Sequence, residues 1–146
     1  MKLSRLEEAL TKCWDEKTSS DPEDWTSENP AWGQCAVAAL IVNDYLGGEI
    51  VWAEAKLPDG RSISHYFNQI EGKEIDLTRR QFPDGTVIPP GVEKKKQYAS
   101  TREYVLLAPG STTKARYEIL KERIDEDLDG YGRPIDIIAS RFMKKS

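Results

Sequence analysis

Cys35, His65 and Asp76 are the residues whose types could carry out nucleophilic chemistry, and they occur in that order along the chain. A thiol nucleophile needs a base within hydrogen-bond reach, and that base needs a carboxylate or an amide that holds its tautomer and orientation. His65 is the only histidine, so a mechanism that uses an imidazole must use this one. The order alone leaves a second interpretation open, in which His65 is a structural residue and Cys35 is a buried core thiol.

The segment NPAWGQCAVAALIVNDYLGG, residues 29–48, indicates how Cys35 is placed. A turn-forming stretch gives way to a helix from about Gln34 to Leu46, which ends at Gly47-Gly48, a signal of a helix C-terminus. Apolar side chains surround nearly the whole circumference, as is typical of a central helix covered by a sheet. Cys35 is then held at the helix N-terminus, where the helix dipole favours the thiolate.

Three strands are expected after this helix, in residues 49–56, 62–70 and 74–78. Pro58-Asp59-Gly60 and the segment EGK at residues 71–73 supply the turns between them. These short connections predict an antiparallel meander, because antiparallel neighbours can be joined by a tight turn.

The length of the second turn decides which face of the sheet His65 occupies. A two-residue turn at Glu71-Gly72 places His65 diagonal to Asp76 on one face, within reach of two polar side chains. A three-residue turn pairs Asn68 with Asp76 instead and sends His65 to the opposite face, because a one-residue slip reverses every side chain. The catalytic arrangement therefore requires the tighter turn.

The other expected elements flank this core. An amphipathic helix is expected from the N-terminus to about residue 16, and another over about residues 113–128. Residues 102–108 are expected to form a further strand, and residues 132–146 carry enough apolar side chains to dock as a strand or a short helix. No linker or internal repeat divides the chain, so we expect a single α+β domain over residues 1–146.

Residues 17–34 are expected to form a long polar loop that contains Trp25 and Trp32. Long loops without secondary structure are uncommon in compact domains and are often functional. The two indoles either cover a groove or fix the loop to the core.

Composition disfavours several classes of function. The chain has 21 Lys and Arg against 25 Asp and Glu, a formal net charge of −4, which does not suit binding to nucleic acid. No apolar stretch suggests a signal peptide or a membrane span. The cysteines and the histidine do not have the spacing of a zinc site, and no glycine-rich phosphate loop is present. Two cysteines fit a reducing cytoplasm better than a disulfide framework. We therefore expect a cytoplasmic protein without a metal or a cofactor.

Three motifs, GQCAVAALIVNDYLGGEI, HYFN and EIDLTRRQF, resemble those of the YunG-type family of small bacterial proteins over about residues 29–82. Their order also resembles the core of papain-like cysteine hydrolases, a class that includes the NlpC/P60 and transglutaminase-like groups. In that class a cysteine begins a helix packed on an antiparallel sheet, and the histidine and the third residue come from neighbouring strands. The resemblance implies a papain-like core with Cys35 as nucleophile, His65 as base and then acid, and Asp76 as orienting group.

One departure from the papain-like pattern concerns the oxyanion hole. Papain-like enzymes commonly draw a donor from a glutamine several residues before the cysteine, whereas here Gln34 directly precedes Cys35 and Asn29 lies at about the usual distance. Gln34 can equally cap the helix, and the backbone N–H of Cys35 is a further donor, because helix N-terminal amides lack partners and point outward. Gln34, Asn29, Trp32 and Asn68 are the side chains we expect to contact an oxyanion or a substrate.

Two functions remain in view from the sequence. The first is a cysteine hydrolase or acyltransferase that attacks an amide, ester or thioester through a Cys-His-Asp triad. The second is a catalytically silent module on the same fold, in which Cys35 is inert and the tryptophan-bearing loop binds a peptide or a protein. The reactivity of the Cys35 thiol distinguishes them.

Overall fold

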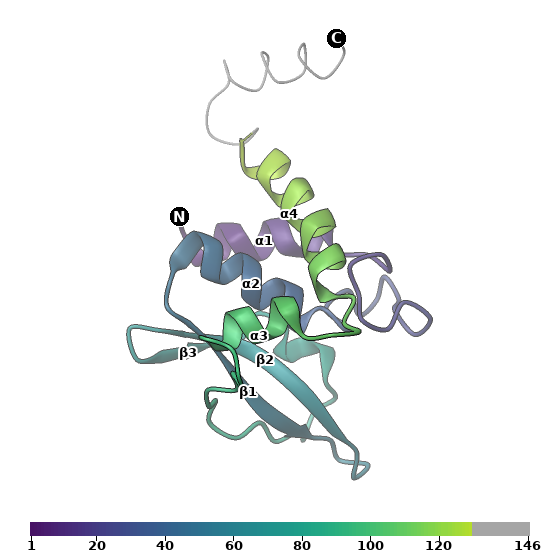
Figure 1. The fold of residues 1–146 in the computed structure, drawn as a ribbon. Helices are drawn as coiled ribbons and strands as arrows, with labels where there is room; N and C mark the ends of the chain where they lie inside the picture. Colours follow the sequence, from purple (N-terminus) through teal and green to yellow (C-terminus); the bar gives the residue numbers. More distant parts are fainter. Residues whose placement is uncertain (130–146) are drawn as a thin grey trace.

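The computed structural model describes residues 1–129, which form an α+β fold with four α-helices on one side of a three-stranded antiparallel sheet (Figure 1). The sheet has the order β1-β2-β3. Its strands are β1 (Glu49–Lys56), β2 (Ser62–Ile70) and β3 (Lys73–Ile75). The helices are α1 (Leu3–Cys13), α2 (Cys35–Leu46), α3 (Thr101–Leu107) and α4 (Thr113–Asp129), with a short 3-10 helix η1 (Arg79–Gln81) after β3.

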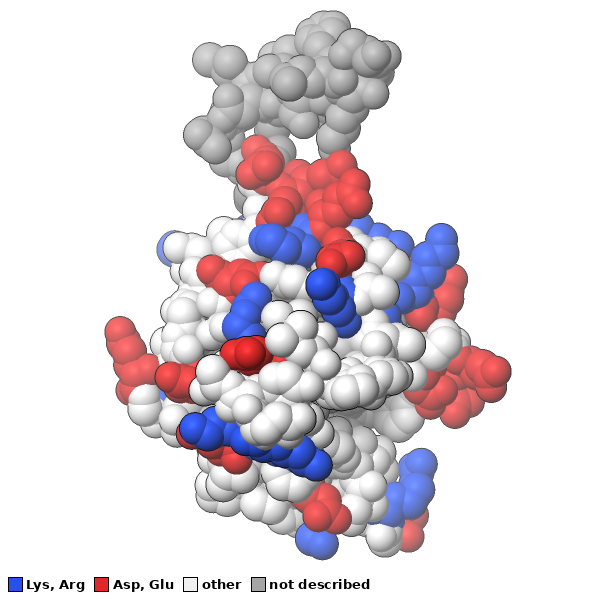
Figure 2. All heavy atoms as spheres, in the orientation of Figure 1, with Lys and Arg blue, Asp and Glu red and all other residues white. Residues whose placement is uncertain are grey.

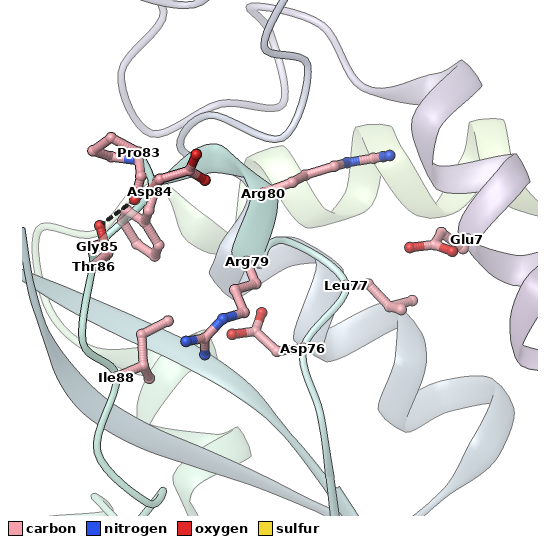
Figure 3. Close-up of a pocket in the computed structure, with 11 residues that line it drawn as sticks. Glu7, Asp76, Leu77, Arg79, Arg80, Pro83, Asp84, Gly85, Thr86 and Ile88 are labelled. Atoms are coloured by element: carbon pink, nitrogen blue, oxygen red, sulfur yellow. Dashed lines mark hydrogen bonds between the residues drawn. The ribbon is translucent and has the colours of Figure 1, made fainter.

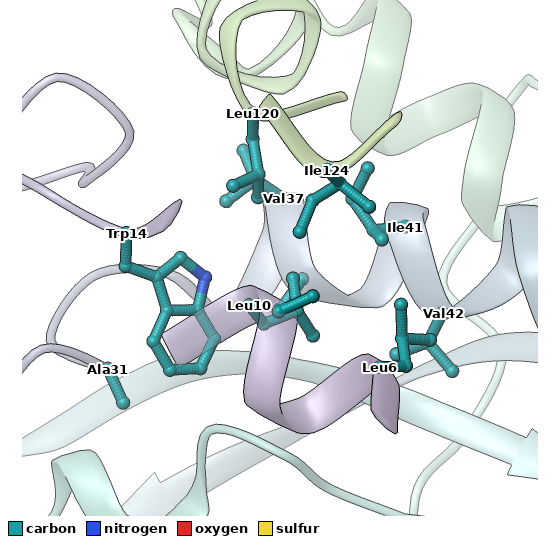
Figure 4. Packing of buried hydrophobic residues seen from close by; sticks show 11 residues of the cluster. Leu6, Leu10, Trp14, Ala31, Val37, Ile41, Val42, Leu120 and Ile124 are labelled. Carbon is teal, nitrogen blue, oxygen red and sulfur yellow. The ribbon is translucent and has the colours of Figure 1, made fainter. Parts of the chain in front are cut away.

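Helix α2 is the centre of the fold, as its apolar circumference predicts. One side of α2 packs between α1 and α4, and Figure 4 shows the side chains of all three helices meeting in one cluster. The members of that cluster on the helices include Leu6, Leu10, Val37, Ile41, Leu120 and Ile124. The opposite side of α2 packs on the sheet and α3 through Ala36, Ala39 and Leu40. Residues 36–42 of the helix are therefore buried on both sides.

The turn between β2 and β3 is the two-residue turn that the catalytic arrangement requires. Ile70 pairs with Lys73 and Asn68 pairs with Ile75, so only Glu71 and Gly72 lie between the strands. Both turn residues have positive φ, 52° at Glu71 and 78° at Gly72. This is the geometry of a type I′ hairpin, whose twist matches that of the strands. Strand β3 is shorter than expected, and it ends before Asp76.

The region from residue 100 onward differs from the sequence expectation. Residues 102–108 do not form a strand, because Thr101–Leu107 is the helix α3, capped by the Ser100 side chain, which accepts a hydrogen bond from the Glu103 N–H. The predicted helix over residues 113–128 is confirmed as α4. The first helix ends at Cys13 rather than near residue 16. The expected docking segment at residues 132–146 lies outside the described residues.

The surface carries charges of both signs. In the view of Figure 2, Lys and Arg are interspersed with Asp and Glu, and acidic side chains gather over the end of α4. Within residues 1–129, no helix is both long enough and apolar enough to cross a membrane.

The long loop before α2 is held by hydrogen bonds of its own. Trp25 Nε1 donates to the Pro30 carbonyl at 3.0 Å, and Trp32 Nε1 donates to Asp21 Oδ2 at 3.1 Å. The two indoles therefore fix the loop to itself. Gly33, just before Cys35, has a φ of +73°, and a Cβ built there would lie 2.3 Å from Ser19 Oγ. Only glycine fits this close approach, which sets the direction in which the chain enters α2.

We expect Gly33→Ala to destabilise the fold more than a matched change elsewhere. Gly60 also has a positive φ, +92°, but a Cβ added at Gly60 would have no neighbour within 4 Å, so Gly60→Ala isolates the backbone cost of about 1–2 kcal/mol. Gly33→Ala adds a collision costing about 1–3 kcal/mol more. Urea unfolding of both variants measures the difference, and equal losses would contradict the close approach at Gly33.

Candidate functional site

His65 and Asp76 form a buried pair at the sheet. His65 lies in β2, and Asp76 follows the end of β3, where the tight turn returns the chain beside β2. His65 Nε2 and Asp76 Oδ2 are 2.6 Å apart, and the His65 side chain is fully buried. Asp76 Oδ1 accepts a hydrogen bond from the Thr78 N–H at 3.2 Å. Both carboxylate oxygens are thus held, and an ionised Asp76 fixes the proton of the ring on Nε2.

Aromatic side chains enclose the His65 ring. Phe67 stacks on it with ring centroids 5.4 Å apart, and Phe82 meets it edge-on at 5.0 Å. These apolar walls exclude water from the imidazole and hold its plane. Because burial removes the water that would stabilise a protonated ring, polar neighbours must stabilise that charge instead.

Figure 3 shows a hollow lined in part by Asp76, whose side chain lies beside that of Arg79. The hollow has a volume of about 470 Å³, and charged side chains line much of it. They are Glu7, Asp76, Arg79, Arg80 and Asp84. Of the two arginines, Arg80 donates to Thr11 Oγ1 and lies over the Trp14 ring. This hollow reaches the carboxylate that orients the imidazole.

The start of α2 is held beside the segment that carries Asp76. Asn29 Nδ2 donates to the Gln81 carbonyl at 3.0 Å, and the Gly33 N–H donates to Gln81 Oε1 at 3.1 Å. Gln81 lies in η1, five positions after Asp76 in the printed sequence, and is itself buried. The two hydrogen bonds therefore bring Cys35, the first residue of α2, next to the His65–Asp76 pair. Its side chain is partly exposed.

The Cys35 thiol interacts with the His65 ring. Burial by itself lowers the pKa of His65, but the hydrogen bond with Asp76 and the interaction with Cys35 raise it, to about 9 in total. Nδ1 is the nitrogen available to the thiol, yet it has no partner of good hydrogen-bond geometry among the described residues. We therefore regard the contact as close but poorly aligned.

We infer that Cys35 lies at the edge of β2, because it influences side chains on both faces of the strand. His65 and Tyr66 are neighbours in β2, so their side chains point to opposite faces. Cys35 acts on both, because burial, Tyr104 and then Cys35 raise the pKa of Tyr66 to about 12. Strand β3 pairs only with Asn68–Ile70, which leaves the edge of β2 beside His65 without a strand. The N-terminus of α2 can approach there.

The sequence analysis missed Arg116, which lies in α4 and is 9% exposed. Its side-chain hydrogen bonds go to neutral oxygens: Thr112 Oγ1 at 3.0 Å, the Thr18 carbonyl at 3.0 Å and Thr113 Oγ1 at 3.2 Å. Burial lowers the pKa of Arg116, and the charge of nearby Cys35 opposes that effect. A buried cation therefore lies near enough to Cys35 for their charges to interact. Arg116 shares the helical spacing of Leu120 and Ile124, but this spacing alone does not show that its charge is buried.

The four side chains expected to contact a substrate all donate hydrogen bonds to the protein itself. They are Gln34 Nε2 to the Asp15 carbonyl, Trp32 Nε1 to Asp21 Oδ2, Asn29 Nδ2 to the Gln81 carbonyl and Asn68 Nδ2 to the Ala39 carbonyl. Gln34 is fully buried and does not cap α2 with its side chain. The backbone N–H of Cys35, in the first turn of α2, is therefore better placed as an oxyanion donor than these four side chains.

Comparison with known proteins places the chain in a family. The family model described as YunG protein matches residues 2–129. The chain belongs to the YunG protein family. A relative named "Uncharacterized protein YunG", from Bacillus subtilis (strain 168), is 27% identical over 127 residues, which cover 87% of this chain and 95% of the relative. No solved structure matches the chain.

The YunG match is longer than the motifs that suggested it. Those motifs lie in residues 29–82, whereas the family model also spans α1 and α4. Arg116 therefore lies within the YunG region, as do the three residues of the candidate site. Among the described residues, no group of three or more His, Cys, Asp or Glu is placed to hold a metal ion.

The raised pKa of His65 predicts a loss of stability at alkaline pH. The pKa of His65 is 6.5 in the unfolded chain and about 9 in the folded protein, so its stabilisation is complete below pH 6.5 and is lost as pH rises through 9. The loss is at most about 3 kcal/mol. Urea unfolding at pH 6.5, 8 and 9.5 should show a shallower decline for Asp76→Asn, which removes the partner. Asp84→Asn, in the same hollow, should decline like the wild type; parallel curves for all three proteins would contradict the prediction.

Arg116 is expected to support the reactivity of Cys35. In a Cys13→Ser background, where Cys35 is the only thiol, Arg116→Met should slow alkylation by iodoacetamide at pH 6 about threefold to tenfold, because a positive charge near the sulfur is lost. Arg116→Lys should retain most of the rate. Arg102→Met, which removes an ion pair with Asp44, is the control. An unchanged ratio of the rates at pH 6 and pH 9 in Arg116→Met would refute the electrostatic role.

Proposed function

We propose that this protein is a cysteine hydrolase or acyltransferase that acts on an amide, ester or thioester bond. The observation that carries the proposal is the buried His65–Asp76 pair, with a His65 pKa of about 9, beside a partly exposed thiol at a helix N-terminus. An imidazole that holds its proton at neutral pH can pair with a thiolate. The helix dipole and the Arg116 cation both favour negative charge on that sulfur.

The first half of the reaction forms a thioester. The Cys35 thiolate attacks the carbonyl carbon, and the backbone N–H of Cys35 donates a hydrogen bond to the oxyanion that develops. The His65 imidazolium then gives its proton to the leaving amine, alcohol or thiol as the bond to the carbonyl carbon breaks. The products are a free leaving group, a neutral imidazole and an acyl group on the Cys35 sulfur.

The second half restores the enzyme. Neutral His65 takes a proton from water, or from an acceptor amine, as its oxygen or nitrogen attacks the thioester carbonyl. The carbon–sulfur bond breaks, and the thiolate and the imidazolium are regenerated. Asp76 keeps its charge throughout and holds the ring in one orientation, so that proton transfer needs no rotation of the imidazole.

A papain-like core is part of the proposal. The papain-like arrangement needs a helix that begins with the cysteine, an antiparallel sheet, and a histidine and a third residue from neighbouring strands. Helix α2, strand β2 and the residue just after β3 supply these parts in the same order. Both cysteines are free thiols, which supports placing the reaction in a reducing cytoplasm.

Cys13 provides an internal control for the thiol. Cys13 is partly buried like Cys35, but burial and then Asp127 raise its pKa. At pH 6 we expect Cys35, in the Cys13→Ser variant, to react with iodoacetamide at least about tenfold faster than Cys13 in the Cys35→Ser variant. His65→Ala should remove the advantage. Intact-mass measurement after addition of p-nitrophenyl acetate should show one acetyl group on Cys35, absent from Cys35→Ser.

Two results would overturn the proposal. Equal alkylation of the two thiols at pH 6, with no effect of His65→Ala, would make Cys35 an ordinary packing residue. Absence of any acetyl-enzyme would then favour the silent binding module on the same fold.

A further inference from the structure

A second cavity lies beside the first turn of α2, and it shares no lining residue with the charged hollow. Its volume is about 210 Å³, and it lies between α2, β2, α3 and the start of α4. Its walls include Ala36, which follows Cys35, and Tyr66, which follows His65. The other lining residues are Tyr104, Val105, Ala108, Ser111 and Thr113. The side chain at position 111 is exposed and marks the mouth.

The lining is uncharged. Two phenol rings and three small apolar side chains form most of it, and the pKa of Tyr66 at about 12 keeps that phenol neutral. The hydroxyls of Ser111 and Thr113 are already engaged: Ser111 Oγ donates to Thr113 Oγ1 at 2.8 Å, and Arg116 Nη2 donates to the same oxygen at 3.2 Å. A charged ligand group would lose its water there, and the Arg116 guanidinium lies behind Thr113 rather than in the lining, whereas an apolar group has no such cost.

The volume limits the size of the ligand group. A cavity of about 210 Å³ holds the volume of roughly seven waters. Pockets that enclose a whole small ligand usually measure about 300–1,000 Å³. The cavity therefore suits one substituent of a substrate, such as a short alkyl chain or a single ring.

The acyl substituent is the part of the substrate that needs this space. In the thioester the acyl group stays on the Cys35 sulfur through both half-reactions, while the leaving group departs after the first. We propose that the cavity beside Ala36 and Tyr66 receives the acyl substituent of the substrate, and that this substituent is short, uncharged and apolar. This inference rests on the proposed function.

The test is acylation of Cys35 by p-nitrophenyl esters that differ only in the acyl group. The Cys13→Ser protein is mixed with the acetate, the butyrate, the hexanoate and the hemisuccinate, and the burst of p-nitrophenolate is followed. We expect the butyrate to acylate about tenfold faster than the acetate, because two more methylenes leave water. The hemisuccinate, which carries a carboxylate, should be slower than the butyrate.

Two variants change the cavity and one matched variant does not. Ala108→Leu adds a side chain at the wall and should reduce the preference for butyrate over acetate severalfold. Val105→Ala enlarges the cavity and should favour the hexanoate. Ala115→Leu, at an exposed position of α4, makes the same change as Ala108→Leu outside the cavity and should keep the wild-type preference.

The outcomes separate the cavity from the catalytic proposal. If every ester acylates Cys35 at a similar rate, or if Ala108→Leu and Val105→Ala leave the preferences unchanged, the cavity is not the acyl site. The proposed function of the protein then still stands. Faster acylation by the hemisuccinate than by the butyrate would also overturn it. If no ester acylates Cys35 at all, the proposed function fails, and the inference fails with it.

Discussion

The contact between His65 and Asp76 is the interaction on which the candidate site depends. A fully buried imidazole between two phenylalanines can carry a charge only if a partner compensates for the lost water, and Asp76 is that partner. Its position follows from the two positive φ values at Glu71 and Gly72, since one more residue in the turn would move Asp76 to the other face. The backbone geometry of the turn thus determines whether His65, in the adjacent strand, has a carboxylate partner.

The alternation of side chains along β2 divides the surroundings of Cys35 into two environments. His65 points to the face where Asp76 and the charged hollow lie, and Tyr66 points to the face with the small uncharged cavity. A thiol at the edge of the strand can meet both. In the proposed mechanism, His65 transfers protons on one side of the sulfur and the acyl group lies on the other side. The imidazole and the acyl group therefore do not compete for the same space.

Sequence reasoning was most reliable where a single local pattern determined the structure. The apolar circumference of residues 36–42 predicted the central helix, whereas the turn at Glu71-Gly72 was one of two alternatives, which only the hairpin geometry resolved. The helix α3 was missed because β-branched and aromatic residues in residues 102–108 suggest a strand, although Ser100 and Glu103 form a capping pair that stabilises the first turn. Arg116 was missed because burial of a charge depends on long-range packing, which periodicity does not reveal.

The charges around the sulfur favour the ion pair that we propose between Cys35 and His65. From α4 to the sheet the proposed order is Arg116, Cys35, His65 and Asp76, a cation, a thiolate, a cation and a carboxylate. Transfer of the thiol proton to His65 leaves the net charge of the group unchanged, and it places each new charge between opposite neighbours. The neutral thiol–imidazole state would instead leave the buried Arg116 guanidinium and the Asp76 carboxylate at the two ends without charges between them. In the proposed ion pair, a thiolate at Cys35 would also reduce the cost of keeping Arg116 charged in the core, because the charge of Cys35 opposes the effect of burial on the pKa of Arg116.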